Sequence, residues 1–118
     1  MKLMIGNEEY QLEFGVRFLT EMDKTYHAEQ NGFKFGMGLE HALVYLNMEN
    51  PLVLIEIIKA ATAHEKNKPS VTDIKKAIEK YSIENDGMEG LFSQVREELG
   101  NSPWTKTKLK KLKEEMKK

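Results

Sequence analysis

Residues 50–65 read NPLVLIEIIKAATAHE, and this segment decides the fold of the chain. Its apolar run is interrupted only by Glu56, Lys59 and Thr62, which lie three residues apart and therefore predict one narrow polar strip on a helix. A helix that is apolar around most of its circumference belongs in the interior of a domain. Asn50 suits the N-cap position at its start. We expect this segment to form the central helix of the core, with an architectural role.

Composition places the chain among ordinary globular proteins. Its 118 residues are enough for one domain with its own core, and 40% of them are hydrophobic and 31% charged. The net charge of −1 argues against nucleic acid or an anionic membrane as the partner. The chain has no cysteine, which excludes disulfides and thiolate metal sites. No apolar run is long enough to cross a bilayer and no signal-peptide pattern opens the sequence, so we expect a cytoplasmic protein.

Charge is distributed unevenly along the chain. Residues 104–118 contain seven lysines and two glutamates, a net charge of +5, and the preceding 103 residues carry −6. This asymmetry predicts a single globular domain over residues 1–103, followed by a Lys-rich amphipathic helix or tail over residues 104–118.

Residues 2–14 show the alternation of apolar and polar residues that predicts a β-hairpin. If the four residues between Ile5 and Tyr10 form the turn, Ile5 lies opposite Tyr10 and Leu3 opposite Leu12. This register places the apolar residues on one face, which must pack on helices because an isolated two-stranded hairpin is marginal in water. The outer edges of the hairpin remain open to a partner chain.

The rest of the chain has mainly helical periodicity. Ser70 with Asp73 predicts a helix N-terminus, and Gly100 a helix C-cap. The segment QNGFKFGMG at residues 30–38 is expected to be the one true loop, since it contains three glycines. The predicted fold is α+β and predominantly α, with the N-terminal hairpin packed on a bundle of about five or six helices. These helices are expected at residues 15–28, 39–46, 50–65, 70–81, 88–99 and 104–118.

No group of residues in the sequence predicts catalysis. His64 and Glu65 begin a zinc-protease pattern, but position 68 is a lysine, and a metal site needs three or four converging ligands. The glycines of residues 32–38 lack the Gly-Lys-Ser/Thr ending of a phosphate-binding loop. No nucleophile and base can be paired. We therefore expect a protein that is not an enzyme and that holds no metal or cofactor.

Two stretches carry apolar residues that the predicted core does not clearly need. Aromatic residues in a loop either pack into the core or serve as anchors for a partner. The helix over residues 104–118 is either simply solvated, or docks on an acidic partner, or uses its lysines on phosphates. The candidate partner-binding residues are Phe33, Phe35, Met37, Trp104, Leu109, Leu112 and Met116.

The order and spacing of several segments carry a likeness to a known family. These segments are KLMIGNEEYQLEF at 2–14, the helix at 15–26, FKFGMGL at 33–39, IIKAATAHE at 57–65 with Pro69-Ser70 after it, the helix at 91–99, and NSP at 101–103 before the Lys-rich end. In this arrangement the chain resembles the tail assembly chaperones of long-tailed phages and prophages of low-GC Gram-positive bacteria. The likeness covers nearly the whole chain and contains no catalytic signature.

The resemblance implies a non-catalytic protein that coats the tape measure protein in the host bacterial cytoplasm. Such a protein keeps the tape measure soluble, helps the tail tube to polymerise around it, and is absent from the mature virion. In many phages a translational frameshift adds an extension that engages the tail-tube protein. Repeated binding along so long a partner would draw on many weak contacts and on self-association. The alternative from the residues alone is a small helical nucleic-acid-binding or regulatory protein that uses the basic segment 104–118.

Overall fold

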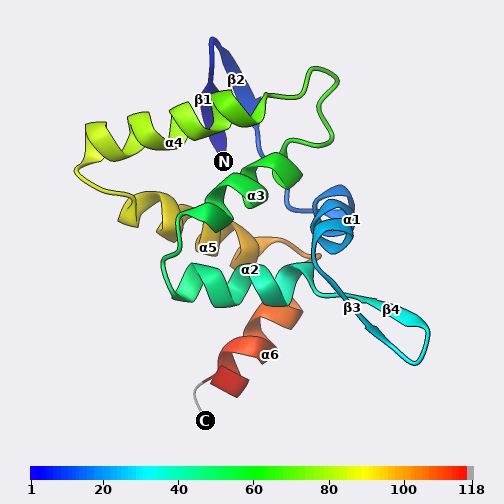
Figure 1. Ribbon diagram of the computed structural model, residues 1–118. Coiled ribbons are helices and arrows are strands. Elements are labelled where there is room, and N and C mark those ends of the chain that lie inside the picture. The colour runs from blue at the N-terminus through cyan, green and yellow to red at the C-terminus, as the bar shows by residue number, and fades with distance from the viewer. Residues whose placement is uncertain (117–118) are drawn as a thin grey trace.

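The computed structural model shows a helical body with two small hairpins, and the structure describes residues 1–116 (Figure 1). This is the predicted α+β, predominantly helical class, with one hairpin more than expected. None of the helices within these residues has the length and apolar content that a membrane crossing requires. The elements are β1 (Lys2–Ile5), β2 (Glu8–Gln11), α1 (Val16–Thr25), β3 (His27–Gln30), β4 (Phe33–Gly36), α2 (Gly38–Asn47), α3 (Leu52–Ala61), α4 (Val71–Asn85), α5 (Glu89–Asn101) and α6 (Lys106–Met116).

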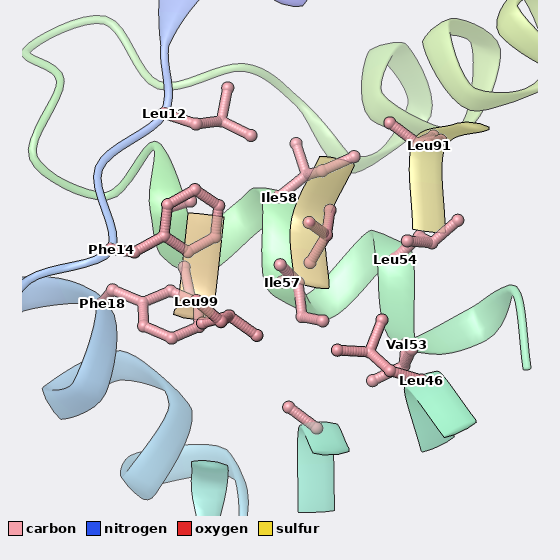
Figure 2. Packing of buried hydrophobic residues seen from close by; sticks show 14 of the residues in the cluster. Leu12, Phe14, Phe18, Leu46, Val53, Leu54, Ile57, Ile58, Leu91 and Leu99 are labelled. Atoms are coloured by element: carbon pink, nitrogen blue, oxygen red, sulfur yellow. The ribbon is translucent and has the colours of Figure 1, made fainter. Parts of the chain in front are cut away.

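Helix α3 lies at the centre of the core, as predicted. Its residues Leu54, Ile57 and Ile58 are completely buried, and α1, α2 and α4 all pack against it. Figure 2 shows side chains of the surrounding helices, among them Phe18 of α1, gathered around α3. The N-terminus of the helix is capped by Asn50, whose Oδ1 accepts a hydrogen bond from the backbone N–H of the second residue after it at 3.0 Å.

The predicted polar strip on α3 is only partly correct. Lys59 is exposed and Glu56 half-buried, but Thr62 is buried. Burial of Thr62 is tolerated because its hydroxyl donates a hydrogen bond to the carbonyl oxygen of Ile58 at 2.8 Å. At the other end of the helix, Leu52 is 68% exposed. The solvated side of α3 therefore includes an apolar residue that the pattern assigned to the interior.

The N-terminal hairpin has the predicted buried face but a different register. Leu3 lies opposite Tyr10 and Ile5 opposite Glu8, so the predicted pairing is wrong by two residues. The turn contains only two residues and begins at Gly6, whose φ of +65° fits the first central position of a type II′ turn. A shift of two residues leaves each side chain on its face, and Ile5 and Tyr10 are buried as expected.

The prediction of a loop at residues 30–38 is wrong, because most of this segment belongs to a second hairpin, β3–β4. Helix α1 correspondingly ends at Thr25 and does not reach residue 28. The turn of the hairpin is Asn31-Gly32, and both residues have positive φ, at 54° and 82°. Positive φ at both central positions defines the type I′ turn, for which Asn-Gly is the preferred sequence.

The sequence signals correctly predicted the start of α4 but not the end of α5. Ser70 caps α4, since its Oγ accepts a hydrogen bond from the N–H of Asp73 at 3.0 Å. Gly100 is not a C-cap, because α5 continues to Asn101. Ser102 ends the helix instead, and its hydroxyl donates to the carbonyl oxygen of Phe14 at 2.6 Å. This bond ties the end of α5 to the segment before α1.

Replacing Ser70 by alanine is expected to lower the free energy of unfolding by about 1 kcal/mol, because the first turn of α4 loses its side-chain acceptor. Urea unfolding followed by circular dichroism measures the change. Ser93→Ala is the matched control, since Ser93 is exposed in the interior of α5, where alanine is the better helix former. Equal losses in the two variants would contradict a capping role for Ser70.

Candidate partner-binding surface

Hairpin β3–β4 extends away from the helical body, and every residue of its two strands is exposed (Figure 1). Phe33 is 68% and Phe35 49% exposed. The register pairs Ala28 with Phe35 and Gln30 with Phe33, so these four residues share one uncharged face of the hairpin. The structure thus places two of the candidate anchors side by side on a projecting element.

The opposite face of the hairpin is charged. Glu29 and Lys34 lie opposite each other in the register, and Lys34 Nζ is 3.9 Å from Glu29 Oε1. Both side chains are exposed, so this ion pair adds little stability. The pair does distinguish the two faces, since one is charged and solvated and the other offers aromatic surface.

The base of the hairpin is fastened to the helices. The N–H of Met37 donates to the carbonyl oxygen of Tyr26 at 2.8 Å, and the N–H of Gly38 donates to Asp23 Oδ1 at 2.9 Å. The ring of Tyr26 stacks on that of His41, with 3.5 Å between the ring centroids. Met37, the third candidate from this stretch, is partly exposed at this base. The position of the hairpin is therefore set by α1 and α2.

A groove of about 550 Å³ lies beside the hairpin base and was not predicted from the sequence. His41 lies between two tyrosine rings there, with its centroid 4.2 Å from that of Tyr45. Burial lowers the pKa of His41, an effect that the Glu56 carboxylate partly opposes, and burial raises the pKa of Tyr26. The spacing of His41 and Tyr45 on one helix face was a visible signal, but the approach of Tyr26 depends on the tertiary fold. The apolar residues lining the groove are Leu52, Val53, Ile55 and Val71.

Helix α6 uses part of its apolar stripe inside the protein. Leu109 is only 2% exposed and belongs to the core, and Leu112 is half-buried against it. Leu109 therefore offers only a small part of its surface to a partner in this arrangement. Trp104 is 61% exposed just before the helix, and Met116 is partly exposed at its end. Of the four candidates in this segment, the structure leaves these two most open to a partner.

The start of α6 is bonded to the helical body. The buried Thr105 hydroxyl donates to the carbonyl oxygen of Leu99 at 2.5 Å. Lys108 Nζ lies 2.6 Å from Glu40 Oε2 on α2. These contacts and the burial of Leu109 dock the helix on α5 and α2. The proposed boundary between residues 103 and 104 stays a prediction.

The three histidines lie apart from one another. His27 is exposed on β3, and His41 is in the aromatic groove. His64 Nε2 lies 3.3 Å from Glu65 and 3.8 Å from Glu13. Over residues 1–116 no three histidine or carboxylate side chains come close enough together to share a metal ion.

Comparison with known proteins identifies the family. A family model described as "Phage tail assembly chaperone protein, TAC" matches residues 2–114, a range that includes both hairpins and most of α6. Searches among curated proteins and among solved structures gave no match. The family assists the assembly of phage tails without catalysis, and its role implies tail proteins as partners. A match over nearly the whole chain means that this protein belongs to the phage tail assembly chaperone family.

Proposed function

We propose that this chaperone binds the tape measure protein, keeps it soluble in the host bacterial cytoplasm, and assists polymerisation of the tail-tube protein around it. The proposal includes release of the chaperone before the virion is complete. It also includes contact with the tail-tube protein through a frameshifted longer form. Family membership supports an assembly role, and the projecting aromatic hairpin supports direct contact with a partner.

The observation that carries the proposal is the exposed uncharged face of hairpin β3–β4. Phe33 and Phe35 are two residues apart on one strand and point to the same side. Aromatic residues at interfaces bury large areas and contribute a large share of the binding free energy. The free edges of the two strands also leave backbone N–H and C=O groups that an extended segment can pair with.

Trp104 is the second proposed anchor, and Met37 and Met116 are proposed as adjoining contacts. Trp104 lies close to α1, with its Cδ1 3.7 Å from the position that a Cβ on Gly15 would take. A long partner is met repeatedly along its length, so individual contacts of modest strength give high overall avidity. Leu112, which is half-buried on α6, is proposed to add a further apolar contact to the partner.

The test is co-purification of the chaperone with a co-expressed fragment of the tape measure protein. We expect the double substitution Phe33→Ser and Phe35→Ser to weaken the measured affinity about ten-fold or more, because both anchors are lost. Trp104→Ser, made separately, is expected to weaken it less. Circular dichroism confirms that each variant is folded.

The matched control replaces Val44 and Ile83 by serine. Both are exposed apolar residues, at 46% and 76%, and lie on other elements, α2 and α4. The control variant should bind the fragment as the parent chain does. Unchanged co-purification of the hairpin variant, or an equal loss of affinity in the control variant, would contradict the proposal that the hairpin contacts the tape measure protein.

A further inference from the structure

A second groove lies between the end of α5 and the exposed side of α6, with a volume of about 590 Å³. Its floor is formed by Gly100, with the nearly buried side chain of Leu109 below it, and the methylene groups of the lining lysines form its walls. The absence of a side chain at Gly100 keeps the floor open, since a Cβ there would lie 3.8 Å from Leu109 Cδ2, with no closer neighbour. This volume is comparable to that of clefts that hold small ligands in proteins.

Three lysines line this groove: Lys106, Lys110 and Lys113. They lie at positions i, i+4 and i+7 of α6, so they form one row about 10.5 Å long on the helix. Among the described residues, the only lysine of α6 with a carboxylate partner is Lys108, which pairs with Glu40 on α2. The groove therefore combines an apolar floor with a row of positive charges that the fold does not neutralise.

From this geometry we infer that the α5–α6 groove binds an acidic amphipathic helix of a partner protein. Carboxylates at i, i+4 and i+7 of such a helix have the same spacing as the three lysines. The apolar residues beside them would pack on the floor at Gly100 and on the methylene groups of the lysines. This is the helix-in-groove mode of recognition, in which apolar contact gives affinity and charge gives orientation.

The charge pattern favours a different protein over a second copy of this chain. No helix of this sequence carries acidic residues at i, i+4 and i+7, although the net charge outside residues 104–118 is negative. The apolar floor favours a protein over nucleic acid, since phosphate contacts need no such surface. The groove shares no residue with hairpin β3–β4, so the inference stands or fails independently of the proposed function.

The test measures binding of a labelled synthetic peptide by fluorescence anisotropy, with the full chain. The peptide is an amphipathic helix with glutamates at i, i+4 and i+7 next to leucines, and its matched partner has glutamine at those positions. We expect the glutamate peptide to bind about ten-fold more tightly than the glutamine peptide, and less tightly as salt is added.

The groove variant replaces Lys106, Lys110 and Lys113 by glutamine. It is expected to bind the glutamate peptide about ten-fold more weakly than the parent chain. The control variant replaces Lys66, Lys68 and Lys111 by glutamine. These three lysines do not line the groove, and the control variant has the same net charge as the groove variant. It should retain the affinity of the parent chain.

A second variant, Gly100→Met, fills the floor and leaves the lysines in place. A loss of affinity of about ten-fold in this variant supports insertion of the peptide into the groove. Equal losses in the groove and control variants, equal binding of the two peptides, or no binding by the parent chain would overturn the inference. Binding of duplex DNA that is tighter than that of the peptide and is lost in the groove variant would assign the lysines to nucleic acid.

Discussion

Ile57→Ala is expected to lower the free energy of unfolding by about 2–5 kcal/mol. Ile57 is completely buried at the centre of α3, and its truncation removes buried methyl groups and leaves a cavity that the neighbouring helices fill only in part. Domains of this size are stable by about 5–15 kcal/mol, so one substitution takes a large share of the total. Urea unfolding followed by circular dichroism at the helix band measures the loss.

Leu52→Ala on the same helix is the control. Leu52 is 68% exposed, so its truncation should change the free energy of unfolding by less than about 0.5 kcal/mol. A loss below about 1 kcal/mol for Ile57→Ala, or a similar loss for Leu52→Ala, would show that α3 is not the centre of the core.

Gly38→Ala is expected to destabilise the protein by about 3 kcal/mol, although alanine is the better helix former. A Cβ at Gly38 would lie 2.5 Å from Met22 Cβ, 2.6 Å from the Met22 carbonyl carbon and 2.9 Å from the backbone nitrogen of Asp23. Because backbone atoms are among these neighbours, α1 and α2 must move apart. That movement also strains the hydrogen bond from the Gly38 N–H to Asp23.

Gly100→Ala is the matched control, since this glycine also lies in the terminal turn of a helix. The nearest atom to its added Cβ is 3.8 Å away, which is ordinary contact. This variant should gain up to about 1 kcal/mol of stability in the same urea experiment. Effects of the same sign at the two glycines would contradict the close crossing of α1 and α2.

The elements that follow from local signals were predictable. The apolar pattern and Asn50 gave α3 and its start, and Ser70 gave the start of α4. The face of the first hairpin was also correct, because side-chain alternation alone determines it. The register of this hairpin was not correct. A two-residue turn and a four-residue turn bury the same face, so the alternation of side chains does not distinguish the two registers.

The second hairpin was missed because its strands are fully exposed. With both faces solvated, β3 has no alternation of apolar and polar residues, and its sequence HAEQ reads equally well as the end of a helix. The one available signal was Asn31-Gly32, whose positive φ values fit a tight hairpin turn. Phe33 and Phe35 were correctly singled out, although for a loop.

The exposure of the C-terminal candidates could not be read from the sequence. An apolar stripe at Leu109, Leu112 and Met116 looks the same in a free amphipathic helix and in one docked on its own domain. Docking depends on contacts with α5, which precedes α6, and with α2, which is distant from α6 in sequence. The aromatic groove at His41 depends on the fold in the same way, since Tyr26 reaches it from the end of α1.

The fastening of hairpin β3–β4 and of α6 to one helical body has a geometric consequence. Hydrogen bonds at Gly38 and at Thr105 hold both elements against the same group of helices, so neither is joined to the body by a flexible linker alone. The distance between the aromatic face of the hairpin and the exposed surface of α6 is therefore fixed. An elongated protein that engages both surfaces would be covered in segments of equal length, one for each bound molecule of this chain.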